Sequence, residues 1–357
     1  MNKNQVHFIA LALFSAILFG ISAPLAKLLL GEFHPVSLAA FLYLGSGLSL
    51  LVIKIFQRLS RNSDNTEARL VPVDYKWLGG ATLAGGIIGP ILLLFSLQST
   101  PAATASLLLN FESVATAIIA VILFKEAFSN RALWAVLSIT VATILLSFDK
   151  EATWGFSFGA IGIVAACLFW GLDNNLTRNI SAKDPITIVC IKGLAAGLFS
   201  LCMASLIGYP LPAWDVVLKA LMLGSISYGV SIIFFIWAMR GLGASRTSAL
   251  FSTAPLSGLI LSIFLFREAP SFLFFPALLI MAFGTFLIVN EKHNHDHIHE
   301  ALDHDHSHIH EDGHHDHTHD GIIDPKPLKH THIHTHERMV HRHNHMPDTH
   351  HRHSHMN

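Results

Sequence analysis

Charged residues are scarce in this sequence. Asp, Glu, Lys and Arg make up 13% of its 357 residues, whereas a soluble globular protein carries about 25%. Hydrophobic residues make up 52%, and the mean hydropathy is +0.51. The net charge of −1 averages two different regions, an apolar body and a polar tail that begins near residue 291. This composition predicts an integral membrane protein with a polar appendix.

Several chemical signatures are also missing. The three cysteines, Cys167, Cys190 and Cys202, lie in apolar runs without a CxxC spacing, which predicts packing side chains and no disulfides. The glycine-rich stretch "GGATLAGGIIGP" (79–90) predicts close helix packing, because no GxxxxGK[ST] nucleotide loop is present. No catalytic triad lies in a polar setting, and no strongly basic patch indicates nucleic acid. We therefore expect neither an enzyme nor a nucleic-acid-binding protein.

Long apolar runs fill the first 290 residues. A bilayer core about 30 Å thick needs roughly 20 apolar residues in a helix. On that criterion the sequence predicts ten transmembrane helices, at 6–30, 33–57, 75–97, 102–124, 130–148, 154–178, 185–208, 215–240, 244–266 and 270–290. The first is too long for the apolar part of a signal peptide, and Pro24 would block cleavage after it. We expect it to stay in the mature protein.

The basic residues of the loops predict the orientation of these helices. If the N-terminus is cytoplasmic, one set of loops faces the cytoplasm and carries Arg58, Arg61, Arg69, Lys76, Lys125, Arg131, Arg178, Lys183, Arg240 and Arg246. The opposite loops carry Lys27, Lys150 and Arg267. Because cytoplasmic loops are enriched in Lys and Arg, both termini are expected in the cytoplasm.

The two halves of the body resemble each other. "LFKEAFS" (123–129) matches "LFREAPS" (265–271) at an offset of 142, as "ATASLL" (103–108) matches "SRTSAL" (245–250). "LFG" (18–20) matches "FWG" (169–171) at an offset of 151. Each half has five crossings, an odd number, so the second half enters the membrane upside down. The sequence thus predicts two inverted repeats, 6–148 and 154–290, an arrangement common in secondary transporters, followed by a tail at 291–357.

These features resemble a known family. Ten helices in two halves, with an "FKEA" or "FREA" closing the fourth helix of each, are similar to the EamA-type members of the drug/metabolite transporter superfamily. "FWGLDNNLTRNISAKDP" (169–185) is similar to the start of the second EamA repeat in one bacterial branch. Many relatives have Trp-Gly in the first helix, where this chain has Phe19-Gly20. The resemblance implies a proton- or gradient-coupled carrier, often an exporter of amino acids or other small metabolites, and we expect it in the inner membrane of a bacterium.

Glu112 is the leading candidate for substrate binding or coupling. It lies near the middle of the fourth predicted helix, beside Asn110, and an ionisable residue within a membrane span is a functional candidate. Its carboxyl could cycle between protonated and ionised forms during transport; alternatively, it is a neutral side chain bonded to a neighbouring helix. The repeat places Ala254 opposite Glu112, so only one half carries the acid, and Pro255 would break the ninth helix at the same depth.

A second candidate set lies in the sixth and seventh predicted helices. Asp173 and Lys192 fall at similar depth on antiparallel neighbours and could form an ion pair, with Asn174 beside them. Such a pair could bind the charged ends of a zwitterion or simply join two helices. Lys27, near the outer end of the first helix, could extend its ammonium to the membrane surface, and its resemblance to a first-helix lysine of the family makes it a candidate gate residue. Glu126 and Glu268 occupy equivalent helix ends, which favours a repeated structural role.

The tail is rich in histidine. Of the 25 histidines in the chain, all but His7 and His34 lie in 293–357. The first cluster, taken as candidate metal ligands, is His293, His295, His297, His299, His304, His306, His308, His310, His314, His315, His317 and His319. Alternate side chains share one side of an extended chain, so imidazoles could surround Zn²⁺, Ni²⁺, Co²⁺ or Cu²⁺. With few apolar residues, the tail is expected to be disordered without metal; a pH-responsive polyelectrolyte is the alternative.

Together these observations favour a secondary active transporter that exports a small polar metabolite, such as an amino acid or derivative. The alternative is a divalent-metal (Zn, Ni or Co) efflux or homeostasis protein, with a membrane-anchored metal buffer as a third class. The expected partners are the lipid bilayer, a small-molecule substrate and metal ions, and two copies of the chain could form a homodimer. We expect the carrier itself to need no cofactor.

Overall fold

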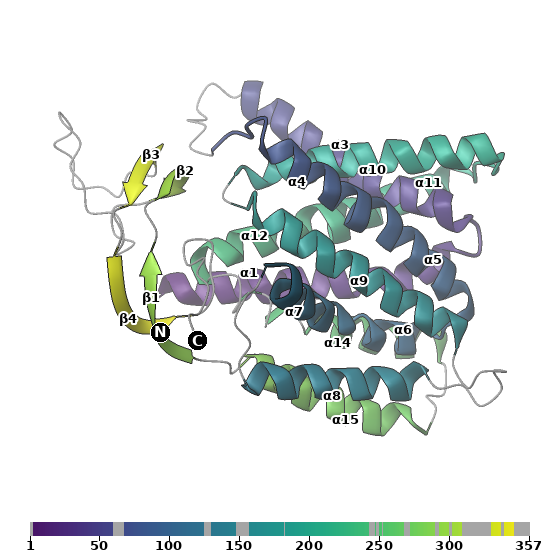
Figure 1. Ribbon diagram of the computed structural model, residues 1–357. Helices are drawn as coiled ribbons and strands as arrows, with labels where there is room; N and C mark the ends of the chain where they lie inside the picture. Colours follow the sequence, from purple (N-terminus) through teal and green to yellow (C-terminus); the bar gives the residue numbers. More distant parts are fainter. Residues whose placement is uncertain are drawn as a thin grey trace.

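The computed structural model describes two parts of the chain. In the apolar body it describes residues 3–59, 68–124, 130–147, 157–181, 183–242, 247, 250–251, 253–267 and 272–289. In the tail it describes residues 293–299, 302–308, 330–336 and 339–345. The regular elements of the described body are helices, packed side by side as a bundle (Figure 1). The predicted all-helical membrane fold is confirmed.

The helices occupy the ten places that hydropathy predicts, numbered here TM1 to TM10 in chain order. Several places hold consecutive helical pieces. They are α1 (Lys3–Gly20) and α2 (Ser22–Leu29); α3 (Pro35–Leu59); α4 (Asp74–Ala81), the π-helical turn η1 (Thr82–Ile88) and α5 (Gly89–Ser99); α6 (Ala102–Leu108) and α7 (Phe111–Phe124); α8 (Asn130–Ser147); α9 (Phe158–Arg178); α10 (Pro185–Ile207); α11 (Trp214–Gly224), the π-helical turn η2 (Ser225–Val230) and α12 (Ser231–Leu242); α14 (Ala254–Phe266); and α15 (Phe274–Val289).

Seven of these places, TM1 to TM4 and TM6 to TM8, hold a described helical span long and apolar enough to cross a bilayer, and TM5, TM9 and TM10 hold shorter apolar helices. TM9 differs from expectation in its described residues: 247, 250 and 251 are helical, Thr253 lies in a turn, and α14 begins at Ala254, whereas a single helix over 244–266 was predicted. Pro255 lies in the first turn of α14, where its missing amide hydrogen costs no hydrogen bond. The break that Pro255 predicts in TM9 is therefore present.

The inverted repeat explains how the helices pack. The first helix of each repeat packs against the fourth helix of the other: α1 against α14, and α9 against α7. TM2 and TM7 form a long contact through α3 and α10, and α8 lies alongside α15 at one side of the bundle (Figure 1). Each repeat thus completes its packing with helices of the other.

The matched "LFG" and "FWG" motifs have a steric role in these crossings. A Cβ atom on Gly20 would lie 2.0 Å from the carbonyl oxygen of Ala254, and one on Gly171 would lie 2.8 Å from the backbone of Ala115. Both glycines therefore lie where two helices are too close for a larger side chain. At the Gly171 crossing, the close approach of TM6 to TM4 brings the polar residues that follow Gly171 within reach of TM4.

Asp184 joins TM2 and TM7 at the start of α10. Its Oδ1 accepts a hydrogen bond from the Ile186 amide at 3.0 Å, as an N-cap does, and its Oδ2 accepts one from Thr187 at 2.6 Å and pairs with Lys54 of α3. Burial alone would raise the pKa of Asp184, but these hydrogen bonds and the Lys54 charge hold it below its usual value.

The tail contains four strands in the part that the structure describes. β1 (His293–His299) pairs antiparallel with β4 (Met339–His345), and β2 (Leu302–His308) pairs with β3 (His330–His336). For these segments the structure has strands where the sequence predicts disorder. Histidine at every second position has the period of a strand, so in each pair histidine positions fall opposite one another, for example His297 and His341. Disorder of the tail without metal stays a prediction.

We predict that Asp184→Ala lowers the free energy of unfolding by about 1–2 kcal/mol, because it removes a helix cap and leaves Lys54 without this partner. Thermal unfolding of the detergent-solubilised protein would measure the loss. Because the folded-state pKa is depressed, the carboxylate stabilises the fold above its unfolded pKa of 3.8, and this contribution is lost as pH falls through the lower folded value.

The matched control is Asp215→Ala, which removes an exposed ion pair with Lys219 within one helix. We expect no measurable change in that variant. Equal losses in the two variants would contradict the role assigned to Asp184.

Candidate functional site

TM4 is broken at the place where Glu112 lies. α6 ends at Leu108 and α7 begins at Phe111, so Glu112 is in the first turn of a new helix near the middle of the span. The break frees backbone carbonyls, and the thiol of Cys167 in TM6 lies 3.7 Å from the Leu108 oxygen and 3.8 Å from the Leu109 oxygen. A helix N-terminus favours negative charge, which suits a carboxylate at this position.

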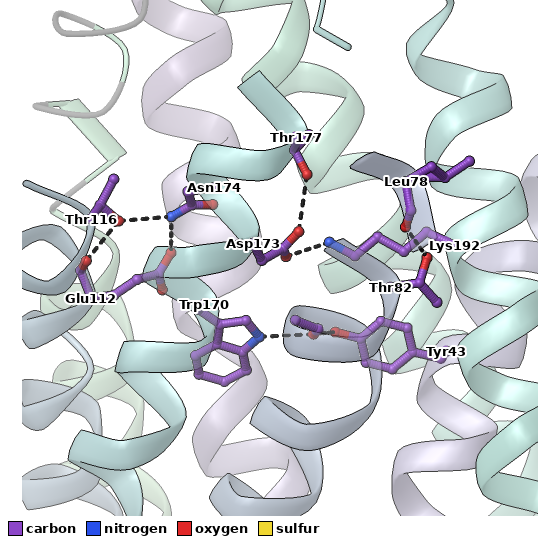
Figure 2. Close-up of polar contacts among 11 residues, drawn as sticks. Tyr43, Leu78, Thr82, Glu112, Thr116, Trp170, Asp173, Asn174, Thr177 and Lys192 are labelled. Atoms are coloured by element: carbon purple, nitrogen blue, oxygen red, sulfur yellow. Dashed lines mark hydrogen bonds and ion pairs between the residues drawn. The ribbon is translucent and has the colours of Figure 1, made fainter. Parts of the chain in front are cut away.

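The Glu112 carboxylate is bound by TM6. The Asn174 side-chain amide donates to Glu112 Oε1 at 2.8 Å and to Thr116 Oγ1 at 3.2 Å (Figure 2). The Asn175 amide donates to the Thr116 carbonyl at 3.0 Å and to the Gly171 carbonyl at 2.8 Å. These residues form what we call the Glu112 cluster: Glu112, Thr116, Asn174 and Asn175. It connects the broken helix of the first repeat to the first helix of the second.

A second group, which we call the Asp173 cluster, lies beside the Glu112 cluster. It consists of Asp173 and Thr177 of TM6 and Lys192 of TM7. Asp173 forms an ion pair with Lys192 of TM7 and accepts a hydrogen bond from Thr177 at 3.0 Å (Figure 2). The side chains of Lys192 and Asp173 are 13% and 9% exposed, so both charges are largely removed from solvent. The ion pair expected from the sequence is therefore present.

The π-helical turn η1 of TM3 lies against Asp173 of TM6 and packs against TM7. The carbonyl of Gly85 accepts hydrogen bonds from the Tyr43 hydroxyl of TM2 at 2.6 Å and from the Trp170 indole of TM6 at 3.0 Å. A Cβ atom on Gly85 would lie 1.9 Å from Asp173 Oδ2, so glycine is required for this approach. In Figure 2, Trp170 and Tyr43 lie beneath the Asp173 cluster.

Aromatic rings line the region next to these clusters. Phe19 of TM1 contacts Trp170 and Tyr228 with ring centroids 6.4 Å and 5.8 Å away, and Tyr228 lies 5.4 Å from Tyr43. A pocket borders this group; its lining includes Tyr43, Ser46, Thr177, Lys192 and Tyr228 together with apolar residues of TM7 and TM8. The pocket therefore places the Lys192 ammonium group and several hydroxyl-bearing residues beside aromatic surface.

The structure brings together four of the six residues that the sequence singled out for binding or coupling: Glu112, Asp173, Asn174 and Lys192. Asn110 is buried at the break in TM4, two residues before Glu112. Lys27 lies elsewhere, where its ammonium donates to the Thr100 carbonyl and sits 5.6 Å from the Phe266 ring centroid. Lys27 thus connects the ends of TM1, TM3 and TM9.

Some sequence-based expectations cannot be placed. Glu126 and Glu268 lie outside the described residues. The same holds for the tail histidines His310, His314, His315, His317 and His319. In the described part of the chain, no three His, Cys, Asp or Glu side chains come together as a metal site.

Sequence reasoning missed Tyr43, Gly85 and Thr116. Tyr43 and Thr116 are ordinary residues of apolar helices, and their contacts depend on helix register across three spans, which no local pattern encodes. Gly85 lies in the glycine-rich stretch interpreted as a close-packing surface. That interpretation holds, because Gly86 would clash with Ala196 if it carried a Cβ, but the hydrogen-bonding role of the Gly85 carbonyl was not foreseen.

Comparison with known proteins gives a consistent result. The model of the EamA-like transporter family matches residues 7–148 and 157–290. An uncharacterized transporter of Methanothermobacter thermautotrophicus is 31% identical over 288 residues, covering 77% of this chain and 83% of the relative. The uncharacterized transporter YyaM of Bacillus subtilis is 25% identical over 264 residues, covering 69% of this chain and 82% of the relative.

A solved crystal structure has the same fold. It covers 78% of this chain and 94% of its own, with a TM-score of 0.57 and 19% sequence identity. At that identity the likeness concerns the fold alone.

We predict that Lys192→Met destabilises the protein by about 3 kcal/mol, because it leaves the Asp173 carboxylate buried without its partner. The double variant Asp173→Asn/Lys192→Met removes both charges and should unfold much nearer the wild-type temperature. Thermal unfolding of the three purified proteins makes the comparison. A double variant less stable than Lys192→Met would show that the pair is not coupled in this way.

Proposed function

Because the chain belongs to the EamA-like transporter family, we propose that it is a secondary active transporter that exports a small polar metabolite, such as an amino acid or a derivative. The family supports membrane transport, and the export direction and substrate are our proposal. The observation that carries it is Glu112, a carboxylate near mid-membrane, at a helix break and hydrogen-bonded across the repeat boundary.

Glu112 suits a role in binding or coupling for a physical reason. Moving an ionisable group into the bilayer is unfavourable, so such a group persists where it has a function or a strong partner. Here the partner is the neutral Asn174 amide, which can bond either an ionised or a protonated carboxyl, since it has both a donor and an acceptor. The amide can therefore bond Glu112 in either protonation state, by donating to a carboxyl oxygen or, after rotating, by accepting from a carboxylic O–H.

The Asp173 cluster suits the recognition of a charged substrate. Lys192 lines the pocket, and its partner Asp173 immediately precedes Asn174 on TM6. A zwitterionic substrate could exchange with this pair, its carboxylate approaching Lys192 and its ammonium approaching a carboxylate of the site. Under this proposal the pair is intact without substrate, which keeps both buried charges compensated.

We also propose the orientation that the loop charges predict, with both termini in the cytoplasm of a bacterial cell. This places the histidine-rich tail on the cytoplasmic side. The tail is proposed to bind divalent metal such as Zn²⁺, Ni²⁺, Co²⁺ or Cu²⁺, because its imidazoles alternate with carboxylates over a long stretch. At four ligands per zinc, its histidines could fill about five sites.

A second candidate function, efflux of a divalent metal or a metal–metabolite complex, is favoured by the tail itself. In that case the tail would deliver or sense the cargo. In the first proposal the metal on the tail regulates the carrier or is unrelated to transport. Truncation separates the two cases, because the tail is continuous in sequence and follows the last helix.

We predict that Glu112→Gln lowers metabolite flux by about a hundredfold or more, the effect expected when a positioned acid or base is lost. The cargo is first identified by comparing growth tolerance of a panel of amino acids and divalent metals with and without the gene. Flux of the protected compound is then followed in cells. Immunoblotting of the membrane fraction checks that the variant is inserted.

The matched control for this variant is Glu32→Gln, which changes an exposed carboxylate between TM1 and TM2. We expect it to transport normally. Full activity of Glu112→Gln would remove Glu112 from the mechanism.

We predict that truncation after Lys292 abolishes high-affinity binding of Zn²⁺ or Ni²⁺ while metabolite flux survives. Isothermal titration of the full-length and truncated proteins measures binding, and the growth panel measures transport. If metal tolerance is lost together with the tail and metabolite flux never depended on the gene, metal efflux becomes the better assignment.

A further inference from the structure

The third span of each repeat contains a π-helical turn in its middle. In TM3 the Gly89 amide donates to the Ala84 carbonyl, five residues earlier, and in TM8 the Ser231 amide donates to the Ile226 carbonyl in the same way. The two donors lie 142 positions apart, as do the two acceptors, and this is the offset that relates "LFKEAFS" to "LFREAPS". The π turns are therefore equivalent features of the two repeats.

Each π turn forms side-chain hydrogen bonds with the first helix of the other repeat. At η1 the Gly85 carbonyl accepts from Trp170 of TM6, and also from Tyr43 of TM2. At η2 the hydroxyl of Ser15 in TM1 donates to the Ser231 carbonyl at 2.7 Å, and the Ser231 hydroxyl donates to the Ser15 carbonyl at 2.9 Å. The contacts at the two turns differ chemically but join helix pairs that are equivalent in the repeat, TM3 with TM6 and TM8 with TM1.

The η1 turn also touches the charged site. Gly85 lies so close to Asp173 that a Cβ would meet its carboxylate, and Trp170 precedes Asp173 by less than one turn on the same helix. Any change in the Asp173–Lys192 pair that moves TM6 must therefore act on the Gly85 carbonyl. A π turn is a local departure from regular α-helical hydrogen bonding, and bends of long helices occur at such turns.

From these observations we infer that η1 and η2 are the paired points at which TM3 and TM8 bend during transport, and that Tyr43 and Trp170 hold η1 in the conformation seen here. This inference rests on the proposed transport function. In an inverted repeat, bending at equivalent points of the two halves gives two related conformations that open to opposite sides. Tyr43 and Trp170 are positioning residues in this scheme.

Backbone amide exchange tests the first part. Hydrogen–deuterium exchange of the full chain in lipid nanodiscs should be faster in 82–89 and 225–231 than in 190–198 of the unbroken helix α10. Tyr43→Phe should accelerate exchange in 82–89 by about three- to tenfold, the range expected when one hydrogen bond is removed, and leave 225–231 unchanged. Ser15→Ala should do the converse.

Two control variants match these changes. Tyr75→Phe removes an exposed hydroxyl from α4, and Ser138→Ala removes a hydroxyl that bonds only within α8. Neither should alter exchange at the π turns. If both π turns exchange as slowly as α10, or if Tyr43→Phe acts no more on 82–89 than Tyr75→Phe does, the inference is wrong.

Spin-label distances test bending itself. In a background with Cys202→Ser, labels at Lys76 and Gln98 span η1, whereas labels at Thr187 and Leu206 span the unbroken α10. Tyr43→Phe should broaden or shift the distance distribution across η1 and leave that of α10 unchanged. An unmoved distribution across η1 would overturn the inference. Neither measurement uses transport, so a failure of the proposed function would appear separately, as full flux in Glu112→Gln.

Discussion

Backbone hydrogen bonding is the constraint on which the irregular parts of this structure depend. Inside a bilayer no water can satisfy a free carbonyl or amide, and each unsatisfied group costs several kcal/mol. Where TM3 and TM4 depart from regular α-helix, a side chain of a neighbouring span meets the backbone: Cys167 at the break in TM4, and Tyr43 and Trp170 at Gly85 in η1. Irregular backbone and polar side chains are therefore parts of one arrangement, and both gather near the middle of the membrane.

The duplicated halves share this framework but differ in their polar residues. Gly20 and Gly171 serve the same close crossing, and TM4 and TM9 restart at equivalent places, where α7 carries Glu112 and α14 carries Ala254 and Pro255. The acid therefore lies on one side of the pseudo-twofold axis. A symmetric frame can adopt two inverted conformations, and a single carboxylate within it would be exposed to each side in turn. The asymmetry is what a carrier with one binding site requires.

Much of this could be predicted from the sequence, because its signals are local. Apolar run length gives the ten spans, the repeated "FKEA" and "FREA" give the duplication, and Pro255 gives the break in TM9. The Asp173–Lys192 pair could be predicted because the two residues lie at similar distances from the same turn, one before it and one after it. The Glu112–Asn174 bond and the two π turns could not be predicted, since they depend on the rotation of each helix about its axis. Tail strands were also missed, although the alternation of histidine has a strand period.

The charges of the two clusters add a further step to the proposed mechanism. Glu112 and Asp173 are two acids, and Lys192 pairs with one of them, so the site carries one negative charge whenever Glu112 is ionised. Asn174 bonds to Glu112 without compensating that charge. An isolated carboxylate at this depth is unfavourable, and either a proton or a cationic group of the cargo would relieve it. Both would occupy the same carboxylate, so binding of one would displace the other. Competition at Glu112 would then couple the movement of protons to that of an amine-bearing metabolite, with no need for a second ion site.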